Sequence, residues 1–124
     1  MSKIIRAINV MISNSERITE VQKGTHETEI FFKYDKKHVW SLLQNREKEF
    51  YMAFFPSKPD IGNLASIPDE HWEDVAPNQV NYSSKELGTK EAKQSMRELY
   101  TLLSEKVYGI DEVLDDIISS DVPF

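Results

Sequence analysis

The sequence contains no cysteine among its 124 residues. Disulfide bonds, thiol nucleophiles and thiolate ligands for zinc or iron–sulfur clusters are therefore excluded, and a reducing cytoplasm is the compartment that suits the chain best. Glycine is also scarce, with four residues and no two of them close together. Phosphate-binding loops of the Walker and dinucleotide-binding types need closely spaced glycines, so nucleotide enzymes of those classes are excluded by motif.

Long apolar runs and long basic runs are missing as well. No apolar run approaches the roughly 18 residues of a membrane-spanning helix, and residues 1–6 lack the uninterrupted apolar stretch of a signal peptide. No basic run is longer than Lys36-Lys37, and the net charge is −6. Because nucleic-acid binding needs several Lys or Arg contacts to phosphates, we expect neither a nucleic acid nor a membrane as partner.

The composition that is present is that of an ordinary globular protein. Hydrophobic residues make up 40% of the chain and charged residues 29%, which predicts one folded domain spanning residues 1–124. The charge is uneven, with net values of +2 for residues 1–56, −4 for residues 57–87 and −4 for residues 88–124. The acidic second half favours a partner with a basic surface.

Residues 3–55 carry the β-branched and aromatic residues typical of strands. Apolar residues occupy both alternating positions of residues 4–12, which predicts a central strand. Alternation and intervening turn residues predict four further strands. These strands cover residues 17–21, 28–34, 38–43 and 50–55. Together the segments predict an antiparallel β-meander of four or five strands.

Two of these assignments have helical alternatives. Ser13 and Glu16 have the spacing of a capping box, so a short helix competes with the strand at residues 17–21. Residues 36–49 also fit a helix with Asp35 as its N-cap. The positions with helical spacing there are Val39, Leu42, Leu43 and Arg46. The density of aromatic and β-branched residues favours strands.

The second half is predicted to be helical after an irregular segment. Residues 56–88 contain four of the five prolines, so regular structure there should be short. Thr89 is a suitable N-cap for a long helix, and Gly109 is a suitable end. Its apolar stripe consists of Ala92, Met96, Leu99, Tyr100, Leu103 and Val107.

A second short helix should begin at Asp111. Its apolar residues Val113, Leu114, Ile117 and Ile118 are predicted to face inward, while Asp115 and Asp116 face water. The predicted fold class is therefore α+β: an antiparallel sheet in residues 3–55, an irregular segment in residues 56–88, and helices in residues 89–119 that cover one face of the sheet.

The best candidate for chemistry is an acidic cluster around a histidine. It consists of Asp69, Glu70, His71, Glu73 and Asp74. Hard cations prefer carboxylate oxygens, and a transition metal would also accept imidazole. The spacing matches neither a calcium loop nor a zinc helix, whereas the acidic first turn of a short helix, with Trp72 packed on the core, explains the same residues. The sequence therefore predicts no catalytic residue, no metal site and no cofactor.

The number of apolar faces is a better indication of function. The sheet offers two faces and the C-terminal helices cover about one, so part of the second face should stay exposed and bind a partner. That face carries Phe31, Val39, Tyr51, Ala53 and Phe55.

We interpret the chain as a small acidic cytoplasmic protein-binding domain without catalytic activity. Immunity, antitoxin and accessory proteins are classes with these properties. The expected partner is another protein, including one with a basic surface, or a second copy of the chain. The predicted binding residues are Phe31, Tyr51, Phe55, Asp69, Glu70, His71, Trp72, Glu73 and Asp74.

Two alternatives stay open. One is a small hydrolase or metal-dependent enzyme, which requires His71 and at least two of its neighbouring acids to converge in a pocket. The other is a ligand-binding domain with a cavity between the sheet and the middle segment.

Overall fold

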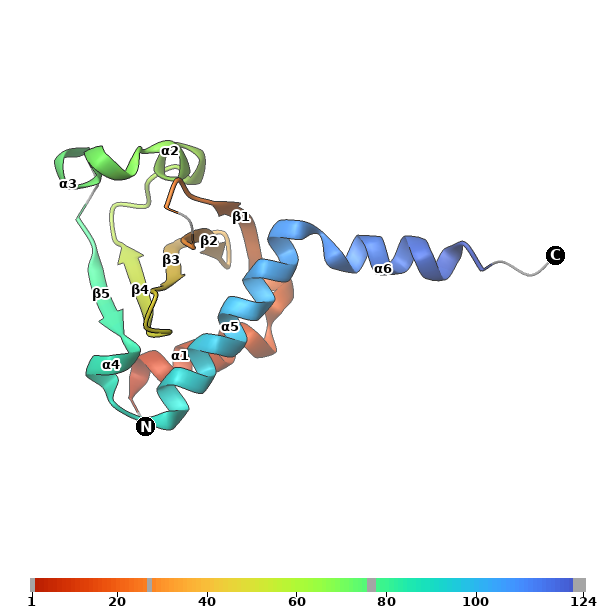
Figure 1. The fold of residues 1–124 in the computed structure, drawn as a ribbon, viewed down its shortest axis with the longest axis horizontal. Helices are drawn as coiled ribbons and strands as arrows, with labels where there is room; N and C mark the ends of the chain where they lie inside the picture. The colour runs from red at the N-terminus through yellow and green to blue at the C-terminus, as the bar shows by residue number, and fades with distance from the viewer. Residues whose placement is uncertain (1, 27, 76–77, 122–124) are drawn as a thin grey trace.

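The computed structural model describes residues 2–26, 28–75 and 78–121, and Figure 1 shows an antiparallel sheet with helices on both faces. The five strands are ordered β1-β2-β3-β4-β5. They are β1 (Ile18–Lys23), β2 (Ile30–Tyr34), β3 (His38–Gln44), β4 (Phe50–Phe55) and β5 (Val80–Ser83). The helices are α1 (Lys3–Ser13), α2 (Ile61–Ser66), α3 (Trp72–Val75), α4 (Ser84–Leu87), α5 (Lys90–Tyr108) and α6 (Ile110–Ser119), with 3-10 turns at Ser15–Arg17 and Asp69–His71. The predicted α+β class is confirmed.

The first segment corrects the prediction of a central strand at residues 4–12. It forms α1, which begins after Ser2, whose Oγ accepts a hydrogen bond from the backbone N of Ile5 at 3.4 Å. The buried residues of α1 recur at helical spacing and form one face: Ile4, Ile5, Ile8 and Met11. β-branched residues favour strands only weakly, and the packing of this face into the main core decides the structure.

The other predicted strands are confirmed. Residues 36–49 resolve as β3 and a turn, because Val39 through Gln44 pair in register with Phe55 through Phe50 of β4. The competing helix after Ser13 is limited to one 3-10 turn before β1. The fifth strand, β5, is not among the predicted strands, and it pairs with β4.

The two faces of the sheet bury separate cores. The larger core packs α1 and α5 on side chains such as Phe32, Leu42 and Met52. The smaller core lies on the opposite face, where Ile61 and Leu64 of α2 cover the sheet together with the partly buried Trp72. The middle segment, predicted as irregular, thus supplies the cover for the second face through short elements.

The two C-terminal helices have different surroundings. Helix α5 begins at the predicted N-cap Thr89, whose Oγ1 accepts from the backbone N of Ala92 at 3.0 Å, and ends at Gly109 with φ of 63°. Its stripe is buried against the sheet and α1. Helix α6 extends away from the body (Figure 1), so the prediction that its apolar residues face inward is wrong. Within the described residues, no helix is both long and apolar enough to cross a bilayer.

Candidate functional site

Three of the predicted binding residues belong to the smaller core. The rings of Phe31 and Phe55 lie 6.1 Å apart, and Trp72 lies 5.9 Å from the first and 6.3 Å from the second. Phe31 and Phe55 are fully buried, so these aromatic side chains pack the sheet against the middle segment. The sequence predicts that some of five residues on the second face of the sheet stay exposed. Tyr51 is exposed, and the other four are buried: Phe31, Val39, Ala53 and Phe55.

The acidic cluster lies on the 3-10 turn and α3. Glu70, His71 and Asp74 are exposed to solvent, while the side chains of Asp69 and Glu73 lie outside the described part of the structure. Among the described residues, no three His, Cys, Asp or Glu side chains come together as metal ligands. The described members therefore show none of the convergence that the enzyme hypothesis requires.

A small cavity lies between the sheet and the middle segment. It has a volume of about 270 Å³, and its walls include Ser41 and Tyr51 from the sheet and Trp72 and Gln79 from the middle segment. The Nε2 of Gln79 donates to Oδ1 of Asn81 at 2.7 Å, and its Oε1 is buried without a hydrogen-bond partner in the described structure. This volume is at the lower limit of small-molecule sites.

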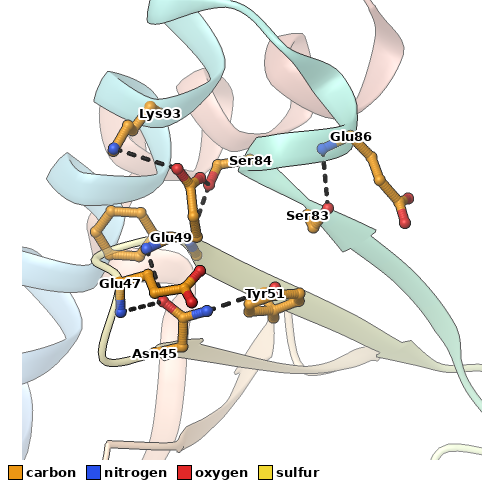
Figure 2. A network of polar contacts seen from close by, with 9 residues as sticks. Asn45, Glu47, Glu49, Tyr51, Ser83, Ser84, Glu86 and Lys93 are labelled. Atoms are coloured by element: carbon orange, nitrogen blue, oxygen red, sulfur yellow. Dashed lines mark hydrogen bonds and ion pairs between the residues drawn. The ribbon is translucent and has the colours of Figure 1, made fainter.

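A polar network joins the β3–β4 turn to α4 and α5, and Figure 2 shows Ser84 and Lys93 directed at the carboxylate of Glu49. The Ser84 hydroxyl donates to Glu49 and accepts from the backbone N of Phe50 at 2.9 Å. The Nζ of Lys93 lies 3.4 Å from Oε1 of Glu49. The Ser84 hydrogen bond is the main cause that lowers the pKa of Glu49, Lys93 adds to it, and partial burial opposes it.

This network holds structural elements together. Ser84 is buried, and its hydroxyl is engaged by both a carboxylate and a main-chain amide. On the other side of the turn, Asn45 Oδ1 accepts from the backbone N of Glu47 and Glu49 at 3.0 and 2.9 Å. The network fixes the start of α5 on the sheet.

An exposed apolar stripe runs along α6, and we call it the α6 stripe. It consists of Val113, Leu114, Ile117 and Ile118, which are 48%, 48%, 60% and 72% exposed. This end of the chain is also acidic, because residues 110–121 contain five acidic and no basic residues. Exposed apolar surface of this kind, flanked by charge, is typical of a docking helix.

A second apolar feature lies at the other end of the chain. A groove of about 550 Å³ runs between α1 and β3, and we call it the α1 groove. It is lined by Lys3, Arg6, Ala7, Val10, Met11, Tyr34, His38 and Trp40. Trp40 is half-buried, its ring lies 4.9 Å from Phe54, and its Nε1 is buried without a hydrogen-bond partner among the described residues. Lys3 and Arg6 are exposed, and neither forms an ion pair with the described part of the chain.

The sequence predicted the apolar residues of the α6 stripe but not their exposure, and it did not predict the α1 groove. The groove exists only because residues 3–13 form a helix. The signal that could have revealed this helix is the three- and four-residue spacing of Ile4, Ile8, Met11 and Ile12, which the apolar residues between them concealed.

Comparisons with known proteins give no further information on the site. Searches against protein-family models, curated proteins and solved structures returned no match.

Proposed function

We propose that this chain is a small, non-catalytic protein-binding domain of the cytoplasm and that α6 is its principal binding element. The observation that carries the proposal is the exposure of the α6 stripe, whose four side chains are between 48% and 72% exposed. Full burial of a completely exposed side chain of this kind contributes about 1.5–3 kcal/mol, and these side chains, already partly covered, would contribute a corresponding part of that. A partner surface therefore gains affinity from the whole stripe.

The length of α6 supports the same function. Isolated helices shorter than about 12–15 residues are marginally stable in water, and α6 has 10 residues. Its contacts within the described structure are mainly with the end of α5, from which it continues. Docking in an apolar groove would stabilise such a helix and bury its stripe, as in other helix-in-groove complexes.

The charge of α6 specifies the partner further. Acidic residues flank the stripe, so a groove with a basic rim would be favoured over a neutral or acidic one. An immunity-like, antitoxin-like or accessory role, in which an acidic protein binds a basic one, fits this chemistry.

Affinity capture from the native cell extract tests the proposal. The full-length protein, Val113→Asp and Val80→Asp are used as baits in parallel. Val80 lies on β5 and is 45% exposed, close to the 48% of Val113, so it controls for the substitution itself. We expect a stoichiometric partner that the wild type and Val80→Asp retain, that Val113→Asp loses, and that binds again when both components are purified. A monomeric protein that recovers no stoichiometric partner would overturn the proposal.

A further inference from the structure

We infer that the α6 stripe of one copy of this chain docks in the α1 groove of a second copy, and that the exchange is reciprocal. This inference rests on the proposed function, because it names the partner of the same stripe. Both components are on the chain, at opposite ends of the sequence, and both are exposed in the isolated molecule.

The two surfaces match in length and polarity. Ten helical residues of α6 extend about 15 Å, and the α1 residues that line the groove, from Lys3 to Met11, extend about 12 Å. Apolar atoms dominate the groove, and Val10, one of its lining residues, is 53% exposed. A docked α6 would cover this valine and the half-buried Trp40.

The charges of the two surfaces are opposite. Lys3 and Arg6 lie along one side of the groove, and both charged residues within residues 2–13 are basic. The turn next to His38, on the other side, contains the exposed Lys36 and Lys37. Acidic residues of α6 that flank the stripe would therefore lie near basic residues on both sides of the groove.

The same charges argue against pairing of two α6 helices. Each copy contributes five acidic and no basic residues in residues 110–121, so two stripes packed together would bring like charges close. Docking within one molecule is disfavoured by geometry, because α6 extends away from α1 (Figure 1). Docking in the α1 groove of a second copy avoids both the like-charge contact and the geometric obstacle.

Reciprocal exchange also explains how short elements form a stable contact. A two-fold arrangement uses each helix–groove pair twice and closes the assembly at a dimer. Doubling the contact brings a small interface closer to the roughly 1,200–2,000 Å² of total surface that stable complexes bury.

Three exposed valines provide a matched test by sedimentation velocity. Val113→Asp changes the α6 stripe, Val10→Asp changes the α1 groove, and Val80→Asp changes neither. We expect the full-length wild type and Val80→Asp to form a dimer of twice the 14.4 kDa chain mass, with dissociation promoted by dilution and by salt. Val113→Asp and Val10→Asp should each weaken dimerisation about tenfold or more, because each places a carboxylate in an apolar contact.

Mixing the two weakened variants tests the reciprocal arrangement. A Val113→Asp copy keeps an intact groove and a Val10→Asp copy keeps an intact stripe, so the mixture regenerates one of the two contacts. We expect a heterodimer that is weaker than the wild-type dimer but stronger than either variant alone. Circular dichroism and thermal unfolding of each variant confirm that the fold is retained.

Several results would overturn the inference. A wild-type protein that stays monomeric at its highest soluble concentration would do so, as would a dimer that resists Val10→Asp or fails to re-form in the mixture. A monomer that still captures a foreign partner through Val113 would refute self-association and leave the proposed function in place. Loss of both activities would refute both.

Discussion

Helices α5 and α6 follow one another in the chain and are both amphipathic, but only α5 buries its stripe. Leu99 and Leu103 of α5 are fully buried, whereas Ile117 and Ile118 of α6 are 60% and 72% exposed. Helical spacing predicts that an apolar stripe exists. The surface that covers it depends on where the fold places the helix.

Specific contacts hold α5 on the body. The Oγ of Ser95 donates to Oδ1 of Asn9 on α1 at 2.8 Å, and the Tyr100 hydroxyl donates to the carbonyl of Thr28 at 2.7 Å. Near the start of the helix, Lys93 contacts Glu49 at the β3–β4 turn. No comparable hydrogen bond between α6 and the body occurs within the described residues.

The largest effect should come from removing a leucine from the buried stripe. Leu99→Ala is expected to lower the free energy of unfolding by about 2–5 kcal/mol, because it leaves a cavity among α5, α1 and the sheet. The same substitution on α6, Leu114→Ala, should change it by less than about 0.5 kcal/mol in dilute solution. Urea unfolding of both variants measures the difference. Equal losses would mean that the α6 stripe is also packed in the monomer.

A smaller loss is expected at the anchor of α4 and α5. Ser84→Ala removes the acceptor for the backbone N of Phe50 and the donor to Glu49, and should cost about 1–3 kcal/mol. Ser66→Ala is the matched control, since the Ser66 hydroxyl is exposed and bonds only to the carbonyl of Asn63. Thermal unfolding should rank the variants in this order, and a similar loss for both would contradict the role assigned to Ser84.

The same anchor predicts a dependence of stability on pH. The Ser84 hydrogen bond, assisted by Lys93, holds the pKa of Glu49 below its ordinary value of 4.5 in the folded state. Folding therefore favours the carboxylate, and its contribution is present above about pH 4.5 and lost as the pH falls through the lowered pKa.

Glu49→Gln should flatten this part of the curve of unfolding free energy against pH. Glu47→Gln, on the same turn but with an exposed side chain, should leave the curve unchanged. Parallel curves for the wild type and Glu49→Gln across the acidic range would show that another carboxyl group causes the dependence. Glu49→Gln should lower the free energy of unfolding by less than Ser84→Ala does, because the glutamine amide keeps part of the hydrogen bonding.

The comparison of α5 and α6 also shows how far the sequence can be read. Strands β2, β3 and β4 were predicted because their alternation and turn residues agree with their tertiary roles. Helix α5 was predicted with both caps, because Thr89 and Gly109 are local signals that the fold uses directly. These elements are specified by neighbours in sequence.

The elements that the sequence did not predict correctly depend on contacts with residues distant in the chain. In α1, isoleucines and valine favour a strand locally, and the packing of Ile5 and Ile8 against α5 overrides that preference. Strand β5 has four residues and exists because β4 offers an edge to pair with. The exposure of the α6 stripe could not be predicted either, since the sequence gives its polarity but not its direction after Gly109.

A small effect on stability is expected at the junction between the two helices. Gly109 has φ of 63°, and a Cβ added there would meet no atom within 4 Å, so Gly109→Ala should cost only the backbone strain of about 1 kcal/mol. Gly88, which ends α4 with φ of 68° and has similar free space, provides a control with the same strain away from α6.

The two alanine variants should therefore unfold at similar temperatures but differ in self-association. In Gly109→Ala, a shift of φ that relieves this strain would change the direction of α6 and should weaken the dimer measured by sedimentation, whereas Gly88→Ala should leave the dimer unchanged. If both variants dimerise like the wild type, the direction of α6 after Gly109 is not required for docking of the α6 stripe on a second copy.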